Sequence, residues 1–368
     1  MKKKLYSFYL LICLSIISCN SADDGPNSGK DFDRSIMLEN FTTNLIIPSY
    51  SNFNSQAEIL LAASNTFNES VTEANLAALQ EAWKKTAEAW NSTQAFNYVG
   101  PAYDSSFIIR INKYPSDKIK IEEHISSSTE INSAFIESLG GGEKGLPAVE
   151  YLIFSQEGNS VILNNFLTEG ENRKAYLKAL TENIKEKAAN LEAGWQPSGK
   201  NYTEAFLSKA GTDAGSSTNL LANSIIQAVE DIKNIKIGEP IGKKGGSLQP
   251  EKVEAFNSEY SIDLIKTDLN AIENAFKGGE GAGFDDYLNK IDAKWQDDQL
   301  LSDRIIQQFE SIRTALDELD NPLNKAVTAE TAEVDKLFNS FTSLVSLLKG
   351  EMISRLGLSV TYTDNDGD

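Results

Sequence analysis

The sequence is poor in the two side chains that build most catalytic and transition-metal sites. Its 368 residues include one histidine, His124, and two cysteines, Cys13 and Cys19. A single histidine excludes paired-histidine catalysis and a histidine-rich metal cage. If residues 1–18 are removed as a signal peptide, Cys19 alone remains. Neither a disulfide nor a cysteine-ligated metal site can then form within the chain, so the fold depends on its apolar core.

Positive charge is also scarce. The chain has 34 lysines and arginines against 53 aspartates and glutamates, a formal net charge of −19. This balance opposes binding to nucleic acid and to anionic membrane surfaces, and it is compatible with attracting cations. It does not identify a ligand.

The N-terminus predicts a membrane anchor. A basic start at residues 2–4 precedes an apolar run, residues 5–17, that is too short to span a bilayer. Ser18 and Cys19 follow, and together they resemble the lipobox of bacterial lipoproteins, in which the cysteine is lipidated. We therefore expect a signal peptide over 1–18 and an acylated polar tether over 19–30. Asp23 and Asp24 resemble the export signals of Bacteroidetes surface lipoproteins, which indicates the cell envelope and its outer membrane. The alternative is an ordinary secretory signal with a chance cysteine.

Apolar residues at spacings of three and four predict helices throughout the rest of the chain. The three longest stripes are Leu76, Leu79, Trp83, Ala87 and Trp90; Leu177, Leu180, Ile184, Ala188, Leu191 and Trp195; and Val334, Phe338, Phe341, Val345, Leu348 and Met352. No sustained period-two run competes, so the fold class is all-α. The turn-rich segment 194–199 divides two expected helical-bundle domains, 31–197 and 198–360, ahead of an acidic tail, 361–368. That tail resembles the start of a calcium loop but lacks the downstream glutamate.

Other segments carry local predictions. Pro250, Val253, Phe256 and Tyr260 suit the first turns of a helix that continues beyond residue 265. Residues 278–283 are glycine-rich without the lysine of a phosphate loop, so they indicate a linker between helices. His124 follows two glutamates, which favours a solvated charged face.

Two segments could line a binding site. Glu150 is the one acid in the apolar run 145–154, where Pro147 suits a first helical turn. An acid in such a run needs a partner, water or a shifted pKa. Gln94 and Tyr98 follow the end of a predicted helix, before a Gly-Pro turn. They line a pocket or belong to a helix-terminating turn, and the residues alone leave both interpretations open.

Several of these segments, in this order, resemble the imelysin family of all-helical bacterial envelope proteins. The segments that carry the resemblance are 82–83 through 94–96, Gly100-Pro101, Tyr114-Pro115, residues 145–152, 173–195 and 236–242, then Pro250, Glu254, Ser258 and Ser261. Residues 145–150 match the family signature Gly-x-His-x-x-Glu, with Pro147 at the histidine position. Ala87 and Gln94 likewise stand where the family often has arginine and glutamate.

The resemblance implies two helical bundles with a site near the signature, close to their junction. It also implies an association with iron-regulated uptake and a classification among metallopeptidases. Proline cannot bind metal or move a proton, so we carry over the pocket and not the hydrolytic chemistry. The expected pocket residues are Trp83, Gln94, Tyr98, Gly145, Pro147 and Glu150.

The functional hypothesis is a lipid-anchored, non-enzymatic envelope binding protein linked to iron or nutrient uptake. Its expected partners are the membrane, through Cys19, and a protein of an uptake system. Carboxylates could hold iron or calcium, but no three Asp or Glu side chains can be identified from the sequence as converging on one ion. One alternative is a metallopeptidase with an altered site, and another is a scaffolding surface lipoprotein without a small ligand.

Overall fold

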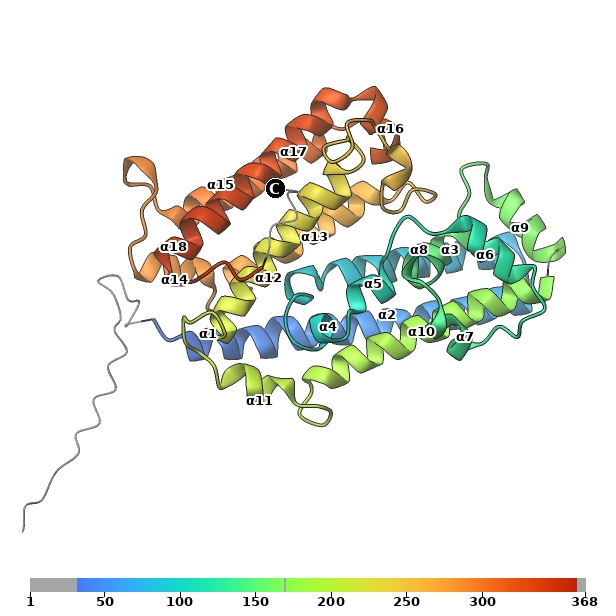
Figure 1. The fold of residues 1–368 in the computed structure, drawn as a ribbon, viewed down its shortest axis with the longest axis horizontal. Helices are drawn as coiled ribbons and strands as arrows, with labels where there is room; N and C mark the ends of the chain where they lie inside the picture. Colours follow the sequence, from blue (N-terminus) through green and yellow to red (C-terminus); the bar gives the residue numbers. More distant parts are fainter. Residues whose placement is uncertain (1–31, 169, 363–368) are drawn as a thin grey trace, which may run out of the picture.

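The computed structural model describes residues 32–168 and 170–362 (Figure 1). The predicted signal peptide, the predicted lipidation site Cys19, the predicted tether 19–30 and most of the acidic tail lie outside the described residues. Within them the chain is helical, and the β-structure there is a single isolated bridge between Lys294 and Leu300. The all-α prediction is confirmed.

The first half of the chain forms one elongated group of helices in Figure 1. Its elements are α1 (Arg34–Asn40), η1 (Phe41–Ile46), α2 (Ile47–Glu69), α3 (Glu73–Asn91), η2 (Gln94–Phe96), α4 (Pro101–Asp104), α5 (Phe107–Ile111), α6 (Lys118–Ile125), α7 (Ser133–Ser138), η3 (Gly141–Glu143), α8 (Gly145–Ile153), α9 (Asn159–Thr168) and α10 (Gly170–Trp195).

The second half begins with α11 (Tyr202–Leu207), which lies beside the first group, and then builds the upper group of helices in Figure 1. The remaining elements are α12 (Ser217–Asp231), η4 (Ile232–Gly238), η5 (Pro250–Lys252), α13 (Ser261–Lys277), α14 (Phe284–Lys290), η6 (Gln296–Asp298), α15 (Leu301–Asp317), α16 (Leu323–Ala329), α17 (Thr331–Val345), η7 (Ser346–Met352) and α18 (Ile353–Arg355).

Helices α2, α3 and α10 form the framework of the first half. The side chain of Thr72 caps α3 by accepting a hydrogen bond from the Asn75 N–H. The predicted stripe of α3 is buried from Leu76 to Trp90 and faces α2, while α10 covers the other side of α2. The helix predicted over 173–195 is confirmed as α10, whose apolar stripe is buried as expected.

The two halves meet where the end of α3 touches the second group of helices. Helix α12 packs against η2, and α13 packs against both α3 and η2. Buried apolar residues of the two halves form one continuous core, including Trp90 and Trp195 on one side and Ile225 and Leu269 on the other. The separation into two domains at residue 197 stays a prediction. The glycine-rich linker prediction is confirmed, since 278–283 joins α13 to α14.

The helix predicted from Pro250 is the element that the sequence placed wrongly. The chain makes only the short turn η5 there, and α13 begins at Ser261. Ala255 and Glu259 both adopt the left-handed conformation, with φ of 54°, which interrupts any helix across this segment. Residues 253–260 therefore form an irregular loop, which supplies Glu254 to the buried charge cluster described next and Ser258 to Glu150.

Candidate functional site

A cavity of 540 Å³ lies where the two halves meet. Its walls come from the end of α3, from η2, from α5 and from the consecutive elements α12 and η4, and Thr361 and Tyr362 complete them. We call it the central cavity. Its size falls within the range of small-molecule sites in proteins.

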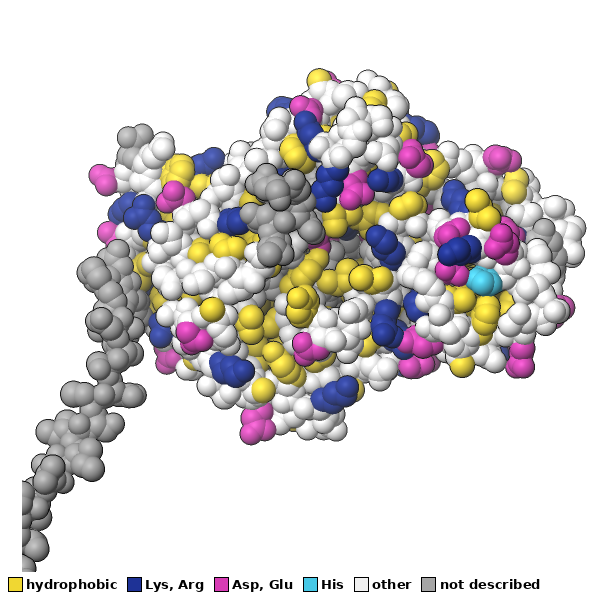
Figure 2. Space-filling view, viewed as in Figure 1, with side chains coloured by type: hydrophobic (Ala, Val, Ile, Leu, Met, Phe, Trp, Pro, Cys, Tyr) yellow, Lys and Arg dark blue, Asp and Glu magenta, His cyan; other side chains and the backbone are white. Residues whose placement is uncertain are grey.

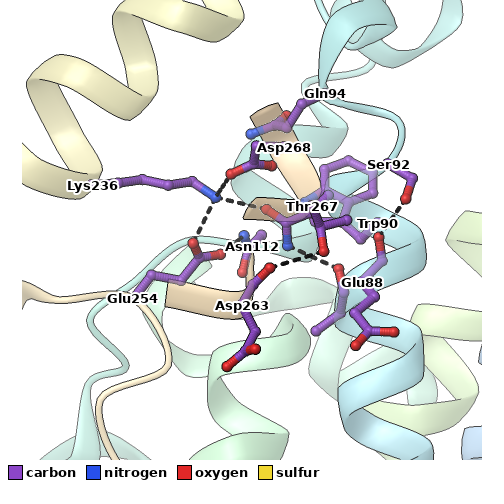
Figure 3. Close-up of polar contacts among 12 residues, drawn as sticks. Glu88, Trp90, Ser92, Gln94, Asn112, Lys236, Glu254, Asp263, Thr267 and Asp268 are labelled. Carbon is purple, nitrogen blue, oxygen red and sulfur yellow. Dashed lines mark hydrogen bonds and ion pairs between the residues drawn. The ribbon is translucent and has the colours of Figure 1, made fainter. Parts of the chain in front are cut away.

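A buried ammonium stands at the base of this cavity. Lys236 belongs to η4 and is 2% exposed. Its Nζ lies 2.6 Å from each of three acceptors, namely Asn91 Oδ1, Asp268 Oδ2 and Glu254 Oε2 (Figure 3). Glu254 comes from the 253–260 loop, and its other oxygen accepts a 2.6 Å hydrogen bond from Asn112 Nδ2. A loop that is not helical thus supplies half of the counter-charge for Lys236.

The electrostatics of this cluster follow from burial and pairing. Burial acts to lower the pKa of Lys236, but the carboxylates of Asp268 and Glu254 outweigh it, so that pKa is raised above its usual value. Burial raises the pKa of Asp268 to about 7, with Lys236 opposing the shift and Glu254 adding to it. Two acids facing one ammonium leave a surplus of negative charge inside the protein.

A third acid, Asp231, lines the central cavity directly. Its carboxylate accepts a short hydrogen bond from the Tyr98 hydroxyl and a 3.0 Å bond from Gln227 Nε2. Burial raises the pKa of Asp231, while these two donors act in the opposite direction. The Tyr98 backbone N–H donates to Ser224 Oγ at 3.2 Å, which fixes η2 against α12.

Gln94 reaches the same cavity from η2. Its side-chain oxygen accepts a 3.0 Å hydrogen bond from Asn97 Nδ2, and Asn97 Oδ1 in turn accepts one from the Tyr50 hydroxyl at the same distance. These bonds hold the segment after α3 in one conformation. Gln94 and Tyr98 therefore lie in a rigid wall of the central cavity.

Glu150 lies elsewhere. It lines a smaller cavity of 310 Å³, together with Pro147, Lys118, Phe256 and Tyr114, and we call this the Glu150 cavity. Tyr114 lines both cavities, whereas Glu150 does not line the central one. One carboxylate oxygen of Glu150 accepts hydrogen bonds from the backbone N–H and the hydroxyl of Ser258, at 2.8 and 2.9 Å. Burial raises the pKa of Glu150 to about 6, against the effect of these bonds.

The other expected pocket residues support the helix that carries Glu150. Pro147 lies in the first turn of α8, as predicted, and Gly145 begins that helix with a φ of +75°. A β-carbon at Gly145 would lie 2.3 Å from the Ile111 carbonyl oxygen, so the close approach requires glycine. Trp83 donates its indole N–H to the Leu146 carbonyl at 2.9 Å and borders neither of the two cavities.

His124 differs from the solvated face expected for it. Its Nε2 lies 2.7 Å from an oxygen of Glu143, and its ring stacks on Tyr176 and meets Phe135 edge-on. The imidazole is half-buried and belongs to the packing around η3, and it does not line the central cavity.

The residues present do not fit a metal ion. Over residues 32–168 and 170–362, no three His, Cys, Asp or Glu side chains converge as metal ligands. The acids that come closest, Glu254 and Asp268, already share an ammonium at 2.6 Å. At the family signature, Pro147 supplies no ligand atom and Glu150 is bonded to Ser258. We therefore derive no chemistry through a metal.

Asp231, Lys236 and Asp268 were not among the residues expected in the site. The sequence does contain an indication for Asp231 and Lys236. Charged residues at positions 230, 231, 233 and 236 stand at the end of a helical segment whose other residues are mostly apolar or small on every face. Nearly all of α12 is buried, and charges in such a helix need internal partners. The acids that pair with Lys236 lie far from it in the sequence, Glu254 in the 253–260 loop and Asp268 in α13, so the sequence pattern does not connect them.

Comparisons with known proteins agree with this architecture. A model of the imelysin family matches residues 46–349. The iron-regulated protein A of Synechococcus elongatus is 22% identical over 302 residues, which cover 81% of this chain and 79% of that protein.

Two solved structures share the fold. One, assigned as an iron-regulated protein A precursor from Parabacteroides distasonis, is 19% identical with a TM-score of 0.73, covering 88% of this chain and 95% of its own. The other, an imelysin-like protein from Psychrobacter arcticum, is 20% identical with a TM-score of 0.71, covering 89% and 97%. The family match spans most of the sequence, and this chain belongs to the imelysin family.

Proposed function

We propose that the protein is a lipid-anchored, non-enzymatic binding protein of the bacterial envelope, linked to the uptake of iron or another nutrient. The central cavity is its ligand site. The observation that carries this proposal is a 540 Å³ space between the two halves, with walls fixed by hydrogen bonds and a buried charged base. Pre-formed cavities with a few placed polar groups are the usual form of a small-molecule site.

The anchor rests on the N-terminal sequence. Within the two described ranges we find no helix with the length and apolarity needed to cross a bilayer. A lipid on Cys19 would hold the protein at a membrane without such a helix. Mass spectrometry of the intact protein tests this directly, because acylation adds the mass of the lipid and a Cys19→Ser variant loses it.

Ligand binding is tested by calorimetry and thermal unfolding of the full chain, purified in detergent, with ferric citrate, calcium chloride and haem. Binding to any of them stabilises the folded state and raises Tm. The variant Ile109→Trp places a large ring at the exposed rim of the central cavity and should abolish that shift. The control is Ile59→Trp, an equally exposed isoleucine on α2. If no probe binds, including the amine, alcohol and acid described below, the proposal is wrong.

The peptidase alternative has a different outcome. It requires zinc at one ion per chain and peptide cleavage that a chelator stops and that Glu150→Ala abolishes. Finding both would replace the binding proposal. A scaffolding role would instead leave every ligand probe without effect and would retain an uptake-system protein during purification.

A further inference from the structure

The ammonium of Lys236 is already engaged by groups of the protein. It has three N–H donors. Asn91 and Asp268 each accept a 2.6 Å hydrogen bond from its Nζ, and Glu254 forms an ion pair with it at the same distance, so three oxygens of the protein already surround this ammonium. Asn91 cannot readily turn away, because its own Nδ2 donates to the Ala87 carbonyl at 2.8 Å. A phosphate or carboxylate entering the cavity would have to displace one of these partners.

The charge around the base of the cavity is negative. Glu254 and Asp268 pair with the ammonium of Lys236, Asp231 lines the same cavity, and all four residues are at least nine-tenths buried. Lys113 also lines the cavity, but it is an exposed residue at the rim and is screened by water. The low-dielectric base therefore attracts a positive group and repels a negative one.

Asp231 offers the direct contact for such a group. Its carboxylate accepts one bond from Tyr98 and one from Gln227 among the described residues. A carboxylate has about four lone-pair positions, so acceptor capacity remains on the side that lines the cavity. Hydrogen bonds from a cation to a carboxylate are about twice as strong as neutral ones.

Aromatic and apolar side chains form part of the walls and of the rim. Tyr98, Tyr103 and Tyr114 all line the cavity, and the rings of Tyr98 and Tyr103 lie 6.4 Å apart at a tilt. Tyr103 and Ile109, at the rim, are 61% and 56% exposed. Figure 2 shows hydrophobic side chains gathered over α4 and α5, which carry these two residues. Aromatic faces attract cations, and they also cover an apolar ligand body.

From this arrangement we propose that the central cavity binds an organic cation. Its ligand is a small amine whose ammonium meets Asp231 and whose apolar or aromatic body lies between Tyr98, Tyr103 and the Ile109 rim. This inference rests on the proposed ligand-binding function and narrows it to a class of ligand.

Three probes of nearly equal shape separate the charge from the apolar contact. They are 2-phenylethylamine, 2-phenylethanol and 3-phenylpropionate, which are a cation, a neutral molecule and an anion at pH 7.5. Calorimetry on the full chain should give the amine an affinity at least about tenfold above that of the alcohol. The acid should show no binding. This series requires no mutation, so it does not depend on the folding of a variant.

The variant Asp231→Asn locates the charge recognition. It should reduce the preference for amine over alcohol by about tenfold while leaving the affinity for the alcohol within about twofold. A purely structural role for Asp231 would lower both affinities together. The control Asp317→Asn removes an exposed carboxylate that pairs with Lys266, and it should leave the preference unchanged.

Three results would overturn the inference. They are tighter binding of the acid than of the amine, an unchanged preference in Asp231→Asn, and binding of none of the three probes. The proposed function fails separately, only if ferric citrate, calcium and haem also leave Tm unmoved. A third pattern separates the two proposals. If haem or the alcohol binds, if Ile109→Trp blocks that binding, and if the amine binds no more tightly than the alcohol, then the cavity is a ligand site. The proposed selectivity for cations is in that case wrong.

Discussion

Replacing Lys236 by methionine tests the buried charge cluster most directly. Methionine keeps most of the volume of the apolar stem and removes the ammonium. Asp268 and Glu254, 0% and 2% exposed, would lose the cation that lies 2.6 Å from each. Removing one partner from a buried ion pair costs about 3–5 kcal/mol of stability, because the remaining charge is left without compensation. We expect a loss of this size in the free energy of unfolding at pH 8.

The loss should shrink as the pH falls. Without Lys236 the pKa of Asp268 rises further, so the folded state binds a proton that the unfolded chain does not hold above about pH 4.5. Folding of the variant is then favoured by acid. The pKa of Asp268 is already about 7 with the lysine present, so in the variant this carboxyl should be neutral at pH 5. We expect the difference between wild type and variant to be smaller at pH 5 than at pH 8.

Urea unfolding followed by circular dichroism at the two pH values measures both quantities. The matched control is Lys266→Met, whose Nζ lies 2.7 Å from Asp317 with both side chains exposed. Such surface pairs contribute at most about 1 kcal/mol. A loss below about 1 kcal/mol for Lys236→Met would show that the cluster does not depend on its ammonium. A loss that grows toward pH 5 would contradict the charge assignment.

Three further substitutions test the helix that carries the family signature. Gly145→Ala should lower stability by at least about 1–2 kcal/mol, because of its positive φ and the Ile111 carbonyl 2.3 Å from the new β-carbon; thermal unfolding measures this. Glu150→Gln should gain stability relative to wild type as the pH rises from well below 4.5 to well above 6, by about 2 kcal/mol in all, since the raised pKa of Glu150 makes its ionised form unfavourable. A flat difference across that range would refute this. Trp83→Phe should lower stability by about 1 kcal/mol in urea unfolding through the lost indole hydrogen bond; no loss would show that the bond is replaced.

The long helices could be predicted because their stabilisation is local in sequence. In α3 and α10 the apolar residues recur with the helical period, and the same residues are buried. The segment 253–260 shows where this reasoning stops. Val253, Phe256 and Tyr260 have helical spacing, yet their burial comes from distant partners. The Tyr260 hydroxyl donates to Glu88, and the ring of Phe256 lies 5.4 Å from Lys118 Nζ.

Of the residues that line the central cavity, the sequence predicted only those that follow α3. Gln94 and Tyr98 follow the predictable end of α3, and both line the central cavity. Asp231 and Lys236 are five residues apart, which places them on different faces of an α-helix. The π-helical element η4 follows Asp231 directly and includes Lys236; its i→i+5 hydrogen bonding widens the turn, and both residues line the cavity. A π-helical turn leaves no periodic signal of its own, so sequence pattern could not place these two charges together.

The family signature and the central cavity are linked through the 253–260 loop. Glu150 holds that loop at Ser258, and four residues earlier the same loop supplies Glu254 to Lys236. With Pro147 at the histidine position, the carboxylate of Glu150 is engaged by backbone and hydroxyl donors. The acid therefore retains a function that needs neither histidine nor metal. It orders a strained loop, left-handed at Ala255 and Glu259, whose other end completes the base of the cavity. Glu150 is thus connected to the base of the central cavity through this loop, although it does not line the cavity itself.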